Sequence, residues 1–160
     1  MKKKSPSIQD WFDAYGESHV NPVNKLIHWI CVPVIFLCIV GLLSLIPIPT
    51  PMAGPTNLIH FGSLGLLLAI VFYARLSWQI ALAMTLCSLI ALLVIRTINQ
   101  AFQNDAWLVY VIAFLLAWIG QFIGHAIEGK KPSFLDDLKF LLIGPAWLLG
   151  FVFRKLNLKY

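Results

Sequence analysis

Charged residues are scarce in this sequence. Only 12% of its 160 residues are Asp, Glu, Lys or Arg, whereas 59% are hydrophobic, and the mean hydropathy of +0.82 lies outside the usual range of soluble domains. A chain of this size cannot bury so large an apolar surplus in one core, so we expect lipid to cover part of it. The composition therefore predicts a single integral membrane domain over residues 1–160.

The basic residues are few, and their placement argues against nucleic-acid binding. The formal net charge is +5, but Lys and Arg lie in short clusters at the ends of apolar segments rather than along a helix face interleaved with aromatic residues. This pattern is typical of orientation in a membrane and of attraction to anionic lipid headgroups. We therefore expect membrane lipids, and no nucleic acid, as partners, and the sequence identifies no protein partner.

Cysteine is also rare, with three residues in the chain. Cys31, Cys38 and Cys87 all lie within apolar segments and form no Cys-x-x-Cys pair, so we expect them to pack as small hydrophobic side chains. A cleaved signal peptide is not expected. Lys2–Lys4 are followed by the polar and aromatic stretch Ser5–Glu17, where a signal peptide would have its apolar core.

Long apolar runs are abundant. Four of them approach the ~20 residues that a helix needs to cross a bilayer, namely Lys25–Ile46, Asn57–Ala74, Leu76–Ile95 and Ala106–Ile127. Pro33 predicts a kink in the first run, and the polar stretch Thr97–Asp105 predicts a loop before the last. Tight connections between such runs are typical of antiparallel bundles. The sequence therefore predicts an all-α integral membrane four-helix bundle.

Two shorter elements flank the predicted bundle. Ser7 and Asp10 have the spacing of a helix-capping pair, and the apolar residues that follow recur with helical spacing, which predicts an N-terminal amphipathic helix. Its aromatic face is expected either to lie on the membrane surface or to pack on protein. The run Leu135–Phe153 is interrupted by Gly144-Pro145, which predicts a broken C-terminal membrane-associated helix.

The basic residues also predict the orientation of the bundle. Lys25 begins the first run, Arg75 follows the second, and Lys130-Lys131 follow the fourth, whereas the turn Pro47–Thr56 carries no charge. Basic residues favour the cytosolic side of a membrane. We therefore expect four crossings, with both termini in the cytosol and the uncharged turn on the far side.

Three of the four histidines are expected to meet. His19 and His28 lie on either side of Pro22, where a non-helical link would let both imidazoles converge at the cytosolic entrance of the first run. His125 lies at the cytosolic end of the fourth run. His60 begins the second run at the opposite face, so a bilayer core of ~30 Å separates it from the other three. The topology predicts one shared site without His60.

The residues around His125 suggest a metal site but leave its chemistry open. Glu128 lies one turn further on the same helix face, and Gly120 and Gly124 would let another helix approach closely. Imidazole binds zinc, copper, iron or nickel, and a nitrogen–oxygen set with open positions suits Fe2+ and O2. An iron enzyme, a zinc-dependent membrane hydrolase, a non-catalytic membrane scaffold, and a small transport subunit with proton-relaying histidines all remain compatible.

Two spaced motifs resemble those of a known membrane family. They are Ser18-His19-x-Asn21-Pro22-x-Asn24-Lys25-x-x-His28 and Gln121-Phe122-Ile123-Gly124-His125-x-x-Glu128-x-x-x-Pro132. Over Trp11–Phe153 the chain resembles the family of the 2-hydroxy fatty acid dioxygenase of phytosphingosine breakdown. The resemblance implies Fe2+-dependent α-oxidation, in which a 2-hydroxy fatty acid reacts with O2 and is shortened by one carbon.

The same resemblance implies catalytic roles for four matched residues. His19, His28 and His125 would be iron ligands. Glu128 would be either a fourth ligand or a carboxylate that anchors a ligand imidazole through a hydrogen bond, unless it is only a solvated carboxylate paired with Lys130 or Lys131.

For this chemistry, polar and basic residues near the histidines suggest substrate contacts. Asn21 and Asn24 would hydrogen-bond ligands or substrate, unless they only cap the first helix. Lys25 and Lys131 would attract the substrate carboxylate, unless they only determine the topology. We expect the protein in a bacterial inner membrane or the endoplasmic reticulum, with its active site at the cytosolic face.

Overall fold

The computed structural model describes residues 6–48, 57, 59–129 and 140–160. Within these residues every regular element is a helix, which confirms the predicted all-α class. The elements are α1 (Ile8–Gly16), α2 (Pro22–Ser44), α3 (Phe61–Leu76), α4 (Trp78–Phe102), the 3₁₀ turn η1 (Gln103–Asp105), α5 (Ala106–Glu128) and α7 (Ile143–Lys155).

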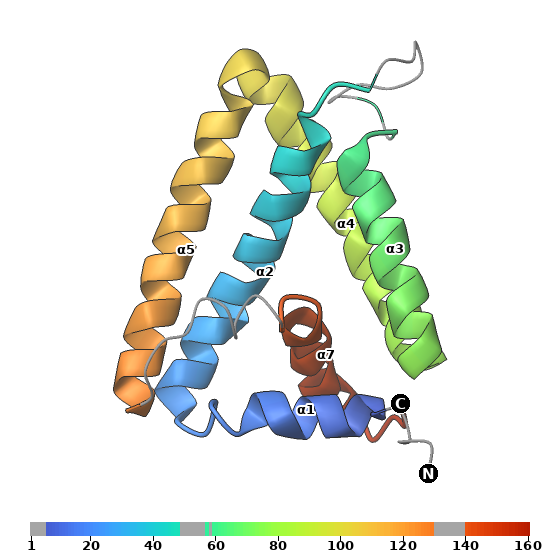
Figure 1. Ribbon diagram of the computed structural model, residues 1–160, viewed down its shortest axis with the longest axis vertical. Coiled ribbons are helices and arrows are strands. Elements are labelled where there is room, and N and C mark those ends of the chain that lie inside the picture. The colour runs from blue at the N-terminus through green and yellow to red at the C-terminus, as the bar shows by residue number, and fades with distance from the viewer. Residues whose placement is uncertain (1–5, 49–56, 58, 130–139) are drawn as a thin grey trace.

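The four long helices form two antiparallel pairs that diverge (Figure 1). α2 pairs with α5 and α3 with α4, and the pairs lie close together where α2 ends but spread apart toward the end of the molecule that holds both termini. α7 lies in the space between the pairs, and α1 runs across their open end. The predicted compact four-helix bundle is therefore not confirmed.

Aromatic and other large side chains fill the space between the two pairs. Phe12 of α1, Tyr73 of α3, Met84 of α4 and Trp147 of α7 belong to one core cluster, and each is at most 4% exposed. The Tyr73 hydroxyl also donates to the carbonyl of Leu142 at 2.5 Å, immediately before α7. α7 therefore occupies the volume that a closed bundle would have filled with side chains of the four long helices.

The predicted amphipathic helix is present as α1. Its capping box is formed as expected, because Asp10 N donates to Ser7 Oγ and Ser7 N donates to an Asp10 carboxylate oxygen. Its inner face is buried: Ile8, Phe12 and Tyr15 pack into the core cluster that contains α7. Of the two alternatives for this face, the structure therefore shows packing on protein.

α2 begins at Pro22, three residues before the predicted start at Lys25. Asn21 caps it, since Asn21 Oδ1 accepts from Val23 N at 2.8 Å. Pro22 occupies the first helical position, where its missing N–H costs nothing. The non-helical link that turns the chain is therefore the segment of residues 17–21 and lies just before Pro22.

The loop predicted at Thr97–Asp105 is wrong for most of its length, because α4 continues to Phe102 and only the turn η1 separates it from α5. Asn99 explains the difference. Its side chain is buried, where it donates to Ser44 Oγ at 3.0 Å and accepts from the Tyr110 hydroxyl at 2.8 Å. A polar residue whose hydrogen bonds are made inside the protein does not require the helix to end.

The C-terminal run differs from its prediction in where the helix lies. Gly144 and Pro145 were expected to break its middle, but they lie in the first turn of α7, where proline is tolerated. The residues of this run before Phe140 lie outside the described part of the chain, as do Lys2–Lys4 and most of the turn Pro47–Thr56.

Among the described residues, two stretches are long and apolar enough to cross a membrane. They are α2, with a mean hydropathy of 2.6, and the stretch Trp78–Glu128, with 2.3, which contains α4 and α5. α3 is apolar but has only 16 residues. Large apolar side chains on the outer faces of these helices are more than half exposed, among them Leu26, Ile30, Leu68, Leu82, Leu86 and Leu116.

Candidate metal centre

The three histidines grouped from the sequence lie together in the structure. His19 comes from the link before α2, His28 from the second turn of α2, and His125 from the end of α5. Their ring centroids are 4.2 Å (His19–His28), 5.3 Å (His19–His125) and 5.1 Å (His28–His125) apart. One potential ligand atom from each lies within 4.8 Å of the others, and no side chain is more than 4% exposed.

Backbone carbonyls orient two of the imidazoles. His19 Nδ1 donates to the carbonyl of Tyr15 at 2.6 Å, and His28 Nδ1 donates to the carbonyl of Asn24 at 2.9 Å. A carbonyl oxygen can only accept, so Nδ1 carries the proton in both rings and the lone pair lies on Nε2. This is the arrangement by which proteins prepare a histidine for metal binding.

The donor set fits a metal ion that accepts neutral nitrogen ligands. Within the described residues the group consists of His19, His28 and His125 alone, without a thiolate or a carboxylate. Imidazoles suit iron, zinc, copper and nickel. The nearest cysteine in sequence, Cys31, is one turn beyond His28 and packs against the α5 backbone at Gly120.

Glu128 holds the link that carries His19. Glu128 Oε1 accepts from Val20 N at 2.9 Å, and Glu128 Oε2 accepts from Asn21 N and from Asn24 Nδ2, both at 2.9 Å. Both carboxylate oxygens are therefore engaged by N–H groups next to the histidine cluster. From the sequence, Glu128 was expected to bind the metal or a ligand imidazole. Its contacts in the structure are instead with N–H groups of Val20, Asn21 and Asn24, which lie between His19 and His28.

Asn24 connects the elements of the site. It is fully buried. Its side-chain amide donates to Ser18 O at 3.2 Å and to Glu128, and its main-chain carbonyl accepts from His28 Nδ1. Asn21, in contrast, acts as the cap of α2, which is one of the two roles expected for it. Asn24 is therefore the residue through which the link, α2 and α5 are joined.

Two glycines let α5 approach α2 closely at this point. A Cβ on Gly124 would overlap Asn24 Oδ1 and reach His28 Cε1 within 3.4 Å, and a Cβ on Gly120 would lie 2.6 Å from Cys31 Sγ. The close approach predicted from the spacing of these glycines is therefore present.

His60 lies apart from the cluster, as predicted. It caps α3, and its Nδ1 accepts from Ser63 N at 3.0 Å. Burial lowers the pKa of His60 from its ordinary value of 6.5, which favours the neutral ring that this acceptor role requires. The start of α3 is at the opposite end of the molecule from the N-terminus of α2 (Figure 1).

Two aromatic residues that the sequence analysis did not assign to the site cover His19. The Tyr15 ring stacks on the His19 ring with centroids 4.2 Å apart and planes at 20°. The Trp147 ring lies 5.4 Å from His19 and 5.1 Å from Tyr15. Tyr15 is four residues before His19, a spacing that could have suggested the contact. Trp147 enters from α7, and no local pattern relates it to the histidines.

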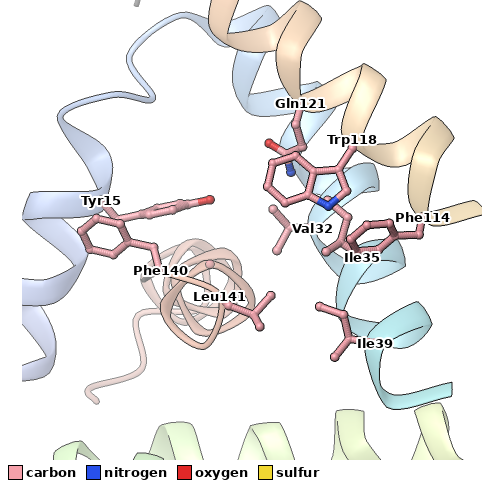
Figure 2. A pocket seen from close by; sticks show the side chains of 10 residues that line it. Tyr15, Val32, Ile35, Ile39, Phe114, Trp118, Gln121, Phe140 and Leu141 are labelled. Carbon is pink, nitrogen blue, oxygen red and sulfur yellow. The ribbon is translucent and has the colours of Figure 1, made fainter. Parts of the chain in front are cut away.

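A narrow cavity of about 50 Å³ lies beside the cluster (Figure 2). Its walls come from α1, α2, α5 and residues 140–144. The lining residues are Tyr15, Val32, Ile35, Ile39, Phe114, Trp118, Gln121, Phe140, Leu141 and Gly144. The polar side chains of the lining are Tyr15, which stacks on His19, Gln121, which precedes His125 by one turn of α5, and Trp118.

The structure describes only one of the two lysines that were predicted to contact substrate. Lys25 is partly buried in the first turn of α2. Lys131 lies outside the described residues.

Comparison with protein families gives a match over almost the whole chain. The model described as Mpo1-like, 2-hydroxy-palmitic acid dioxygenase Mpo1-like, matches residues 5–156. This match agrees with the resemblance found in the two motifs and includes all four histidines. No curated protein and no solved structure matches the chain.

Proposed function

The chain belongs to the Mpo1-like family, and we propose that it is an Fe2+-dependent dioxygenase that shortens 2-hydroxy fatty acids by one carbon with O2. The observation that carries this proposal is the buried cluster of His19, His28 and His125, with two of its imidazoles oriented by backbone carbonyls. Iron bound there would supply the redox chemistry with O2, for which no side chain of the cluster is suited by itself.

The surrounding residues support this chemistry in two ways. Tyr15 and Trp147 cover His19 and keep water from the imidazoles, which prevents side reactions of reactive intermediates. The hydrogen bonds of Glu128 hold the link beside α2 and α5, so that His19 stays opposite His28 and His125.

The cavity supports a substrate with an apolar tail. It begins at Tyr15, which stacks on His19, and continues between α2 and α5, past Ile35 to Ile39 and Phe114. At about 50 Å³, the cavity is smaller than the ~150 Å³ cavity that holds one benzene molecule, so only the carbons nearest the carboxyl end of a fatty acid would lie along these walls. Burial contributes about 0.8 kcal/mol for each methylene group removed from water.

The same elements support a membrane location. We propose that α2, α3, α4 and α5 cross the bilayer and that the histidine cluster lies at the cytosolic face of a bacterial inner membrane or the endoplasmic reticulum. Lipid would then cover the exposed apolar faces of these helices. α3 is short for a crossing, since 16 residues span about 24 Å at 1.5 Å per residue, and local thinning of the bilayer would accommodate it.

Metal content and product formation test the proposal together. The purified protein is loaded anaerobically with Fe2+ and then given O2 and 2-hydroxyhexadecanoic acid, with products identified by mass. We expect one iron per chain and, for each O2 consumed, one pentadecanoic acid, with the carboxyl carbon released as CO2 together with one water. Three imidazoles can also hold catalytic zinc, so stoichiometric zinc without O2 consumption would indicate a hydrolase instead. A metal-free protein of normal stability would indicate a scaffold or transport subunit.

A further inference from the structure

Gln121 is a polar residue in an apolar part of the protein. It lies on α5 one turn before His125, and its side chain is only 4% exposed. Its amide makes no hydrogen bond to any residue that the structure describes, so its donors and its acceptor are available to a molecule in the cavity. Figure 2 shows the amide directed into the cavity that adjoins the histidine cluster.

Two of the three polar side chains that line this cavity, Tyr15 and Gln121, lie at one end of it, and the third is Trp118. In Figure 2 the Tyr15 hydroxyl and the Gln121 amide point toward each other from opposite walls, and both residues adjoin the cluster, Tyr15 through its stacking on His19. Farther along, the lining consists of apolar side chains and of Trp118, whose indole nitrogen also lies beside the cavity. The cavity is therefore suited to an amphiphilic molecule whose polar group lies beside Gln121.

We propose that Gln121 recognises the 2-hydroxyl group of the substrate and so selects 2-hydroxy acids over unsubstituted fatty acids. This inference rests on the proposed function, because it assumes a 2-hydroxy fatty acid in the cavity. An amide can both donate to and accept from a hydroxyl group. A site with a polar group placed for a substrate hydroxyl disfavours the analogue that lacks it, because the polar group of the site then stays unsatisfied.

Binding to the metal-free protein measures this contact without catalysis. Equilibrium binding of radiolabelled 2-hydroxyhexadecanoic acid and hexadecanoic acid is compared for the wild type, Gln121→Leu and Gln121→Met. Wild type should bind the 2-hydroxy acid about tenfold more tightly, the range expected for one hydrogen bond between neutral groups. In both variants the ratio should fall to about one, mainly because the unsubstituted acid binds more tightly once the buried amide is removed.

The ratio separates recognition from a structural role. A variant that merely disturbs the cavity weakens both acids equally and leaves the ratio unchanged, which would overturn the proposal. Gln100→Leu, an exposed position on α4, serves as the matched control and should keep the wild-type ratio. The thermal midpoint of each variant verifies folding, and Gln121→Met retains an unbranched side chain of similar length if Gln121→Leu folds poorly.

The inference and the proposed function can fail separately. Equal affinity of the wild type for the two acids would overturn the role of Gln121, whatever the activity of the iron-loaded protein. Selective binding that is lost in both Gln121 variants would support that role even if the iron-loaded protein formed no shortened acid, a result that would overturn the dioxygenase activity alone.

Discussion

Asn24 Nδ2 donates a hydrogen bond of 2.9 Å to Glu128 Oε2, across 104 positions of sequence. The contact joins the start of α2 to the end of α5, and these are the two helix ends that carry His28 and His125. Since Glu128 also binds the backbone of the link after His19, one carboxylate connects all three segments that provide an imidazole.

Replacement of Glu128 by Gln should weaken metal binding without abolishing it. The Gln side chain keeps one acceptor oxygen, but its NH2 group would face an N–H donor, and the hydrogen bonds lose their ionic character. We expect the metal affinity to fall by roughly 10–100-fold, as for other residues that orient metal ligands. Titration against a competing chelator measures it. Glu17→Gln, at an exposed position at the start of the link, is the control, and equal affinity of the two variants would contradict this role.

The histidines should separate into two classes. His19→Ala, His28→Ala and His125→Ala should each lose product formation and most of the bound iron, because an incomplete set of imidazoles remains. His60→Ala should keep both, since His60 caps α3. Iron analysis of the purified variants checks this. A His60→Ala protein without iron would show that the site is not the cluster described above.

The His60 cap should make stability depend on pH. The folded pKa is lowered by burial, so the unfolded chain binds this proton more readily, and protonation disfavours folding. The contribution is complete above the ordinary pKa of 6.5 and decreases as the pH falls through the folded value. The stability difference between wild type and His60→Ala, measured by denaturation at about pH 8 and about pH 5, should therefore shrink at the lower pH. A stability difference that is the same at both pH values would contradict this prediction.

Gly124→Ala should damage the site through packing. The new methyl group would overlap Asn24 Oδ1 and force α2 and α5 apart, at a cost of about 1–3 kcal/mol. Gly65→Ala is the matched control on α3, where a Cβ meets only Leu43 Cδ1 at an ordinary 3.8 Å. Alanine there should stabilise the helix by about 0.5–1 kcal/mol. Thermal denaturation of both variants, with iron content, checks the contrast; a Gly124→Ala protein as stable as wild type would contradict it.

The proposed topology can be tested with a cysteine at residue 53, which lies outside the described residues. In a Cys87→Ser background, Ala53→Cys should react with a membrane-impermeant maleimide from the side opposite the cytosol. Glu17→Cys should react only after the membrane is permeabilised. Labelling of residue 53 from the cytosol would show that the orientation is the opposite of the proposed one.

Much of the fold could be predicted because it depends on local chemistry. The capping box of Ser7 and Asp10 lies within one turn of chain, and the start of α5 follows directly from the change between polar and apolar residues at Ala106. The end of α4 could not be predicted in this way. The partners of Asn99 are Ser44 and Tyr110, on two other helices, so its burial depends on tertiary structure.

In the candidate site, too, some features could be predicted from the sequence and others depend on tertiary structure. His19, His28 and His125 were grouped from topology alone, and the structure brings them together. The contacts of Glu128 were not anticipated, because backbone N–H groups of a non-helical link leave no trace in side-chain spacing. Trp147 was missed because α7 reaches His19 only when it lies between the two helix pairs.

The carbonyls that orient His19 and His28 belong to the main chain at positions 15 and 24. Every amino acid provides the same carbonyl, so side-chain substitutions at these two positions leave the acceptors in place. A mutational scan would therefore report on the Tyr15 stacking and the Asn24 amide but not on the choice of tautomer. An amide-to-ester replacement that weakens one carbonyl as an acceptor would address that choice directly. The position of the proton on Nδ1 of His19 and His28 therefore depends on the backbone conformation and is robust to side-chain substitution at positions 15 and 24.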